Sequence, residues 1–478
     1  MELPLLLLIP ALAAGFSLTR PGRRWAPPVT VAAMAVVLGL AVAVALAAAR
    51  AGRIAFGEEW LFCDGLGALV VLLVAFVALT AALFSWGTLR RGAHGGSEQS
   101  FYALFNLFVL AMLAVPILAN LALMWIAVAL TTLLSAFLVG FEDTPEALEA
   151  AWKYVVLTTL GAVIALLGFL ILDWGSGIAG GGPFTWAVLT AAAPHMPPAL
   201  LSPAFLLILV GFGTKVGLVP MHTWLPDAHS QAPASICALL SGVETTTALY
   251  VILRLFPVIG AAPGLDARPW FIGFGLVSVG IAGLLLIYVR DFKRLFAFST
   301  VEHMGIILVA AGLGGAEAHL AALYQMAGHA IAKSFCFFAA GVVAMTSGTQ
   351  EIAAVRGLVR SSPVAAAALV AGAIAIAGAP PFALFVSELS ILKAGMASGE
   401  YVAMGLLALF IVVAFCAVMR HVNRMAFGAA DGSPTIAAVP LSCKLTLALA
   451  ALPLFVVGIW IPLPLQSLLH AAAAAMGP

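Results

Sequence analysis

Apolar stretches of about 20 residues, each long enough to cross a bilayer, recur along the whole chain and alternate with short polar loops. The polar and apolar alternation of a membrane barrel is absent. The first stretch lacks a basic start and a small-residue cleavage site, so we expect a membrane helix there and no signal peptide. The pattern predicts an all-α integral membrane protein with about fourteen transmembrane helices, near residues 2–19, 29–49, 64–87, 101–119, 121–140, 151–173, 203–221, 233–256, 270–289, 295–313, 317–346, 362–396, 402–419 and 440–463.

Two similar segments indicate an internal repeat. In "AAWKYVVLTTLGAV" and "AIAKSFCFFAAGVV", Lys153 and Lys333 lie 180 residues apart, and a glycine follows each lysine eight residues later. A unit of five helices has an odd number of crossings, so a second unit would be inverted relative to the first. The sequence thus predicts two inverted five-helix repeats.

Two of the predicted helices are interrupted. The seventh helix contains Lys215 and meets Gly217 and Pro220, whereas the twelfth meets Pro380. Broken helices in corresponding positions mark a transport site near the middle of the membrane. We therefore expect such a site beside these breaks.

The helices divide the chain into four expected parts. Residues 1–100 form an N-terminal three-helix segment, 101–256 the first repeat, 257–425 the second repeat, and 426–478 a C-terminal helix and tail. The stretch "IAGGGPFTWAVLTAAAPHMPP" is predicted to be a loop, and "HAAAAAMGP" a short tail.

Composition supports a membrane location. Only 9% of the residues are charged and 64% are hydrophobic, whereas soluble domains carry roughly 25% charged residues. The net charge of +1 gives no reason to expect a nucleic-acid partner. The five cysteines form no CxxC pair, and no metal-ligand spacing occurs, so we expect neither a metal nor another cofactor.

Basic residues are concentrated in loops of one parity, which are expected to face the cytoplasm. This distribution predicts an inner-membrane protein with both termini outside. The cytoplasmic set is Arg20, Arg23, Arg24, Arg90, Arg91, Arg290, Lys293, Arg294, Arg356, Arg360, Arg420 and Arg424, and the opposite set is Arg50, Arg53, Arg254 and Arg268.

Ionisable residues inside the predicted helices are candidates for a pathway, because a charge at the bilayer centre costs about 2.5–3.5 kcal/mol on insertion scales. Lys153 and Lys393 lie close enough to helix ends to be merely interfacial, and Glu302 and His303 could pair with the basic loop "RDFKR". The candidates are Lys153, Lys215, His222, His229, Glu244, Glu302, His303, His329, Lys333, Glu388 and Lys393.

The chemistry of these residues favours protons as the cargo. Burial disfavours the charged forms of lysine and glutamate, so both can exchange protons near neutral pH, as histidine does. A sodium site would need carboxylates and several neutral oxygens, whereas lysines dominate here. A row of such side chains, separated by one or two waters, can conduct protons.

Four stretches resemble the antiporter-like subunits shared by respiratory complex I, Mrp sodium/proton antiporters and membrane-bound hydrogenases: "GTKVGLVPMHTWLPDAHSQAP", "EAAWKYVVL", "RDFKRLFAFSTVEHMG" and "GAPPFALFVSELSIL". "MWIAVALTTLLSAFLVG" and "GFGTK" are most similar to the hydrogenase-4 type. The resemblance implies fourteen helices, two inverted repeats, broken helices 7 and 12, and a polar axis across the membrane.

The resemblance also implies roles for individual residues. Lys215 matches the lysine of the broken helix, the central proton site of the first half-channel, with His222 and His229 near an access route. The other implied matches are Lys153 in the preceding helix, the pair His329 and Lys333 in the second repeat, and the acid Glu388 after the second break.

Two positions depart from the family's pattern. Ala129 stands where the family usually has the glutamate that pairs with the lysine at 215, and Thr246 stands where many relatives carry Lys or His. Glu244 is an additional acid less than one turn before Thr246. One hypothesis is that Glu244 replaces the missing partner of Lys215; the alternative is that it faces a partner subunit or a water pocket.

The sequence leaves three functions open. The first is a proton-translocating, non-redox subunit of a membrane-bound hydrogenase or complex I-like assembly, with no catalytic centre of its own. The second is the energy-coupling membrane subunit of an inorganic-carbon uptake complex, and the third is a partly degenerate scaffold. The expected partners are other membrane subunits, the lipid bilayer, and a hydrogenase or carbonic-anhydrase-like peripheral subunit.

Overall fold

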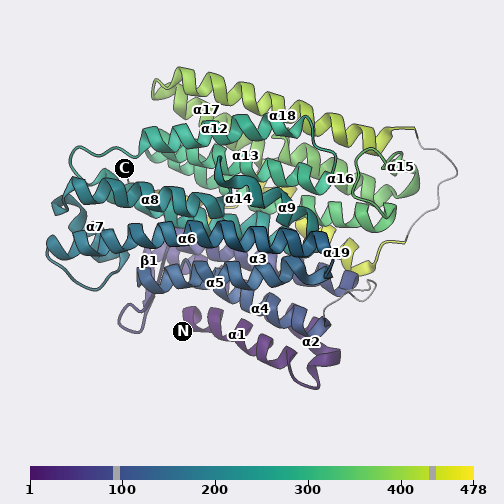
Figure 1. Ribbon diagram of the computed structural model, residues 1–478, viewed down its shortest axis with the longest axis horizontal. Helices are drawn as coiled ribbons and strands as arrows, with labels where there is room; N and C mark the ends of the chain where they lie inside the picture. The colour runs from purple at the N-terminus through teal and green to yellow at the C-terminus, as the bar shows by residue number, and fades with distance from the viewer. Residues whose placement is uncertain (90–96, 430–437, 478) are drawn as a thin grey trace.

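The computed structural model describes residues 1–89, 97–429 and 438–477, and its helices lie roughly parallel along the long axis (Figure 1). Within these residues, eleven helices are long and apolar enough to cross a membrane. The structure therefore confirms a helical membrane protein.

The helices follow one another in the order expected from hydropathy. The N-terminal group is α1 (Glu2–Ser17), α2 (Gly22–Ala51) and α3 (Gly65–Thr88). The next group is α4 (Glu98–Ala114), α5 (Leu121–Val139), α6 (Pro145–Ile178), α7 (Trp186–Ala192), α8 (Pro198–Val216), α9 (Trp224–Gln231), α10 (Ala234–Leu239) and α11 (Thr245–Gly260). The remaining helices are α12 (Arg268–Leu286), α13 (Phe292–Leu313), α14 (Ala316–Ser347), α15 (Leu358–Ser361), α16 (Pro363–Ile376), α17 (Ala383–Ala397), α18 (Tyr401–Phe427), α19 (Leu441–Ile459) and α20 (Leu463–Ala474).

Three local elements differ from the sequence prediction. Strands β1 (Arg53–Phe56) and β2 (Leu61–Asp64) form an antiparallel hairpin, so the described chain is not purely helical. Helix α7 lies within the stretch predicted to be a loop. The helix predicted near 440–463 ends at Ile459, and α20 then covers most of the expected tail, because Pro462 and Pro464 begin a new helix.

Four elements make up the centre of the bundle. α3, α13, α14 and the span from α10 to α11 are all buried over most of their length. α3 packs against α10 and α14, and α13 packs against α14 and α9. This central position places the ionisable residues of α11, α13 and α14 away from lipid.

Both termini lie at the same end of the molecule, at the left of Figure 1, together with the hairpin and α7. α15 lies at the other end. Arg254 does not lie in a loop as predicted, because it is buried within α11. Arg90 and Arg91 lie outside the described residues.

Candidate functional site

A helix break positions Lys215. Helix α8 ends at Val216, and Gly217 caps it in the left-handed conformation at φ +85°. A Cβ atom at Gly217 would lie 2.4 Å from Cδ1 of Leu225, so only glycine fits this turn. The break begins three residues before Pro220, and it leaves Lys215 in the last turn of α8, where the helix dipole favours a cation.

A π-helical segment positions Glu244. The segment η5 (Leu240–Glu244) joins α10 to α11, and the N–H of Thr245 bonds to the carbonyl of Leu240, five residues back. Single π turns of this kind are frequent at functional sites. Glu244 is the last residue of this turn.

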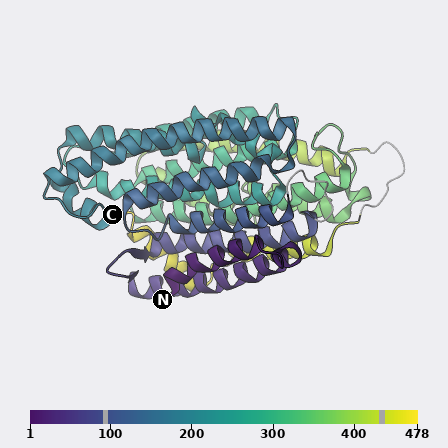
Figure 2. The ribbon, with the colours of Figure 1, turned by 60° about the horizontal axis from the view of Figure 1, so that its bottom comes forward.

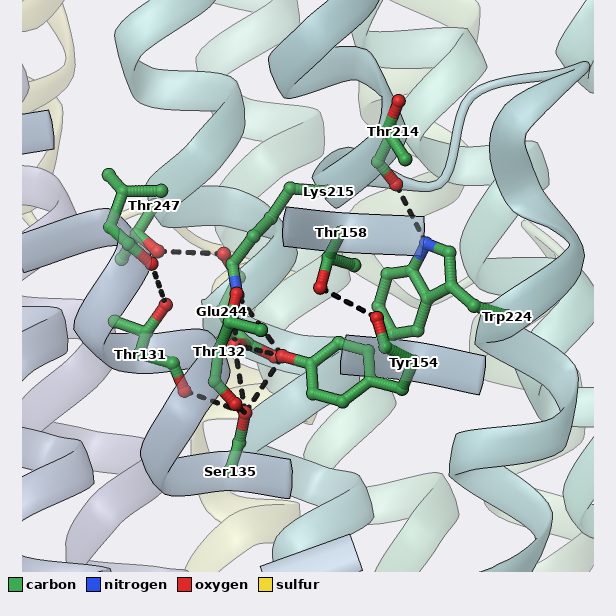
Figure 3. Close-up of polar contacts among 11 residues, drawn as sticks. Thr131, Thr132, Ser135, Tyr154, Thr158, Thr214, Lys215, Trp224, Glu244 and Thr247 are labelled. Carbon is green, nitrogen blue, oxygen red and sulfur yellow. Dashed lines mark hydrogen bonds and ion pairs between the residues drawn. The ribbon is translucent and has the colours of Figure 1, made fainter. Parts of the chain in front are cut away.

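Lys215 and Glu244 form a buried ion pair (Figure 3). The distance from Nζ of Lys215 to Oε1 of Glu244 is 2.6 Å, and the two side chains are 2% and 1% exposed. This geometry confirms the predicted pairing of Glu244 with Lys215.

Hydroxyl groups surround the pair. Nζ of Lys215 donates to Oγ1 of Thr132 at 2.6 Å and to the Tyr154 hydroxyl at 3.1 Å. The Tyr154 hydroxyl donates to Oε1 of Glu244 at 2.8 Å, and Ser135 Oγ donates to the same atom at 3.3 Å. With Glu244, these bonds use all three donors of the ammonium group, which a buried charge requires. Oε2 of Glu244 is buried without a hydrogen-bond partner among the described residues.

The sequence prediction missed Thr132, Ser135 and Tyr154. They come from α5 and α6, and each is a neutral polar residue. The paired threonines "TT" and the tyrosine after Lys153 were the available signals.

A second polar group lies among α13, α14 and α17. Nε2 of His303 is 2.9 Å from the Ile376 carbonyl, and its Nδ1 accepts from the Gln325 amide at 3.0 Å. The same amide lies 3.5 Å from Oε1 of Glu388, and Ser387 donates to the Gln325 oxygen. His303 therefore belongs to this group and makes no described contact with the basic loop at 290–294.

A glycine makes room for Glu388. Gly378 follows α16 with φ +68°, and a Cβ atom there would lie 2.2 Å from Oε2 of Glu388. Helix α16 ends at Ile376, so this break also begins before Pro380. The carboxylate of Glu388 thus packs directly on the interrupted backbone.

Two further residues of α14 lie near this group. Nε2 of His329 is 3.1 Å from the Ser241 carbonyl in η5, and the rings of His329 and His303 are 5.5 Å apart. Lys333, one turn further along α14, donates to the Phe296 carbonyl at 2.6 Å and to Ser299 Oγ. Lys333 is fully buried.

Other predicted residues lie outside both groups, among them Lys153, His222 and His229. Lys153 is partly exposed near the start of α6, where its Nζ is 2.6 Å from Glu149 and 3.4 Å from Asp227. His222 lies half-buried in the turn after the first break. His229 is fully buried in α9, with Nδ1 2.7 Å from the Leu225 carbonyl.

A cavity of about 340 Å³ begins beside Lys153 and Asp227 and is also lined by Trp224. The Trp224 ring contacts the ring of Tyr154, with centroids 4.6 Å apart. The hydroxyl of Tyr154 in turn contacts Lys215. Among the described residues, no group of three or more His, Cys, Asp or Glu side chains is arranged to hold a metal ion.

Comparison with known proteins agrees with this architecture. The family model described as "NADH:quinone oxidoreductase/Mrp antiporter, TM" matches residues 100–415. Hydrogenase-4 component F homolog of Methylacidiphilum infernorum (isolate V4) is 38% identical over 78% of this chain and 80% of the relative. Hydrogenase-4 component B of Escherichia coli (strain K12) is 30% identical over 70% of this chain, which spans only 50% of that relative.

Two solved structures share the fold over nearly the whole chain. A chain of the membrane-bound sulfane sulfur reductase, an archaeal respiratory membrane complex, has a TM-score of 0.88 at 24% identity, covering 99% of this chain and 97% of that one. A chain of the Mrp complex from Dietzia sp. DQ12-45-1b has a TM-score of 0.87 at 20% identity, with the same coverage.

Interrupted helices within a bundle of membrane-spanning helices define a multi-pass membrane protein with an antiporter-like fold. The chain belongs to the NADH:quinone oxidoreductase/Mrp antiporter membrane family, and it is similar to hydrogenase-4 components within it.

Proposed function

We propose that this chain moves protons across the inner membrane along a Lys/His/Glu axis, as a non-redox subunit of a membrane-bound hydrogenase or complex I-like assembly. The observation that carries the proposal is the buried ion pair of Lys215 and Glu244 beside a helix break. Removing one member of a buried pair is strongly unfavourable, so a change in the protonation of either residue would perturb its partner.

The proposed axis connects four groups of residues. Protons would enter at the cavity beside Lys153 and Asp227 and reach Lys215 through Tyr154. From Glu244 they would pass to His329, which bonds to the same π-helical segment, and then to His303. The amide of Gln325 donates to both His303 and Glu388 and so holds them near each other. A water would carry the proton from His303 to Glu388, where it would leave.

Water would complete the link between the two halves. Oε2 of Glu244 and Nδ1 of His329 are both buried without hydrogen-bond partners among the described residues. Buried polar atoms of this kind are usually satisfied by ordered water. One or two waters between Glu244 and His329 would join the proton path around Lys215 to the proton path around His303 and Glu388.

The proposal includes two inverted repeats, α4 to α11 and α12 to α18, between an N-terminal three-helix segment and a C-terminal part. Helix starts support this division. α5 and α13 begin at Leu121 and Phe292, and α6 and α14 begin at Pro145 and Ala316, 171 residues apart in each case. The start of α5 lies beside the hairpin, whereas the corresponding start of α13 lies beside Glu351. Different surroundings for corresponding helix starts are expected if the second repeat is inverted.

The two polar groups correspond under this alignment. Thr132 aligns with His303, and Tyr154 aligns with Gln325. Thr132 contacts Lys215, two residues before Gly217, and His303 contacts Ile376, two residues before Gly378. The alignment favours an offset of 171 residues between the two repeats. Lys153 and Lys333, which are 180 residues apart, then do not occupy corresponding positions.

The partners and orientation follow from the proposed role. Other membrane subunits would cover the exposed apolar faces of the outer helices, and a peripheral hydrogenase module would supply the redox energy. Both termini would face outward, because the loops at the opposite end carry most of the basic residues.

Proton flux in proteoliposomes tests the proposal. The purified chain, with any subunits that remain bound in mild detergent, would be reconstituted and its proton movement followed with an enclosed pH-sensitive dye under an imposed membrane potential. Lys215→Met should lower the rate about 100-fold, as expected for loss of a positioned proton carrier. Lys393→Met, which removes an exposed lysine of α17, should keep the wild-type rate.

Two outcomes would contradict the proposal. If the wild-type protein moves no protons under any imposed potential or sodium gradient, the chain is a scaffold. If Lys215→Met moves protons as fast as wild type, Lys215 is not a proton carrier.

A further inference from the structure

Glu302 is a buried carboxylate with no role in the axis described above. It lies in the middle of α13 and is 5% exposed. No described residue donates a hydrogen bond to it. A buried carboxylate without such bonds is unfavourable, and an apolar side chain of similar size would pack there at lower free energy. Packing alone therefore does not explain this glutamate.

Along α13, Glu302 lies between a residue that contacts Lys333 and a residue that is linked to Glu388. Ser299, which accepts from Lys333, precedes Glu302 by three residues, about one helical turn. His303, which Gln325 links to Glu388, is the next residue. Helices α14 and α17, which carry Lys333 and Glu388, both pack against α13.

Charged groups lie on both helices that pack against α13 beside Glu302. Nζ of Lys333, on α14, reaches Ser299, one turn before Glu302. Glu388, on α17, is linked through Gln325 to His303, the residue after Glu302. Lys333 is held only by the Phe296 carbonyl and Ser299 among the described hydrogen-bond acceptors. Neither acceptor is charged, so Lys333 has no ion pair to break when its flexible side chain turns toward Glu302.

We propose that Glu302 is a proton relay between Lys333 and Glu388, a step that rests on the proposed proton-conducting function. The Lys333 ammonium group gives one proton to the Glu302 carboxylate, which leaves a neutral amine and a neutral carboxylic acid. The acid then passes that proton to the Glu388 carboxylate, directly or through one water, and regains its negative charge. Lys333 is reprotonated from the His329 side.

The relay gives Lys333 a place in the pathway that its contacts alone do not supply. Lys333 makes no described hydrogen bond to His303, Gln325 or Glu388. With Glu302 as intermediate, the buried lysine and the terminal glutamate belong to one route. The neutral amine of Lys333 and the neutral carboxylic acid of Glu302 are also favoured after the first transfer, because low-polarity surroundings disfavour charged groups.

Glu302→Gln tests the relay in the same proteoliposomes. The amide keeps the size of the side chain but cannot carry a proton, so the rate should fall at least about tenfold. Glu302→Asp should recover part of the rate, because it restores an acid on a shorter side chain. Glu317→Gln, which removes an exposed acid from the first turn of α14, serves as the matched control and should keep the wild-type rate.

Infrared difference spectroscopy supplies a readout that a structural role would not change. Titration of the wild-type protein should show a protonated carboxyl band that is absent from Glu302→Gln and present in the control. A wild-type rate in Glu302→Gln, or an unchanged carboxyl band, would overturn the relay. If Lys215→Met still lowers the proton flux in proteoliposomes while Glu302→Gln does not, the proposed function stands and only the relay fails.

Discussion

The ammonium group of Lys215 is stable inside the bundle because each of its three donors has an acceptor. One acceptor is the carboxylate of Glu244, and the others are the hydroxyls of Thr132 and Tyr154. The two hydroxyls come from α5 and α6, whereas Glu244 alone supplies a negative charge. The charge of Glu244 and the hydrogen bonds of the hydroxyls can therefore be removed separately by mutation.

Replacing Glu244 with Gln should lower proton movement about 100-fold, because the lysine would lose the charge that stabilises its protonated form. Ala129→Glu in the same variant should restore part of the rate. Position 129 lies one turn before Thr132, which already contacts Lys215, so a glutamate there can reach the ammonium group. Flux in proteoliposomes measures both effects.

The matched control is Ala129→Gln in the Glu244→Gln variant, which adds the same volume without charge. Recovery with glutamine as well as with glutamate would mean that packing, and not the carboxylate, limits the rate.

The sequence was sufficient to predict the pair but not its surroundings. An ammonium group and a carboxylate are costly enough in a membrane to be conspicuous in the sequence. Thr132, Ser135 and Tyr154 carry no such cost, since a hydroxyl can bond to its own helix, as Ser135 also does to the Thr131 carbonyl. Their role depends on which helices pack together, which hydropathy does not reveal.

At the scale of elements, glycine determines where each broken helix ends. Gly217 and Gly378 both have positive φ, and each lies against a side chain that would clash with a Cβ atom. At the second break the clashing group is the carboxylate of Glu388. The break therefore fixes the position of this acid as well as the path of the chain.

Gly378→Ala should destabilise the protein and displace Glu388. The left-handed conformation alone costs roughly 1–2 kcal/mol for a residue with a Cβ atom, and the carboxylate would also have to move. We expect a lower melting temperature in detergent together with a several-fold lower proton flux.

Gly405→Ala is the control for this change, because a Cβ atom at this helical glycine would meet nothing within 4 Å. It should leave both measurements unchanged. Equal effects of the two substitutions would show that Gly378 is not specially placed.

Most elements were predictable from hydropathy, but η5, the hairpin and α7 were not. A period of 3.6 residues does not distinguish a π turn from an α turn, so η5 is invisible in an apolar segment. The hairpin and α7 are too short for a hydropathy window. Both are held by neighbours far along the chain, as in the bridges between Leu61 and Leu118 and between Asn120 and Thr185.

At the scale of the whole molecule, an ion pair joins the start of α3 to α11. Arg254 of α11 donates to both oxygens of Asp64, the N-cap of α3, at 2.6 and 2.5 Å. Its Nε also donates to the hydroxyl of Tyr250. The two residues of the pair are 190 positions apart, so the pair fixes the packing of segments that the sequence does not place together.

Asp64→Asn should destabilise the fold by about 1–3 kcal/mol, because it leaves the charge of Arg254 without its partner in a partly buried site. The measurement is thermal or denaturant unfolding in detergent. Asp266→Asn breaks the exposed pair with Arg268 and should cost at most about 1 kcal/mol. Similar losses in the two variants would mean that the Arg254 pair adds no more than a surface contact.

The close packing of Gly65 and α20 has a consequence for how the protein is made. A Cβ atom at Gly65, the first residue of α3, would lie 2.5 Å from the backbone of Ala471 and Ala472, and α2 and α3 both pack against α20 (Figure 2). At about 5–20 residues per second, the ribosome reaches Ala471 roughly 20 to 80 s after Gly65. During biosynthesis, α3 therefore waits in the bilayer with an uncovered face, and membrane insertases and quality-control proteases encounter this intermediate before the fold closes.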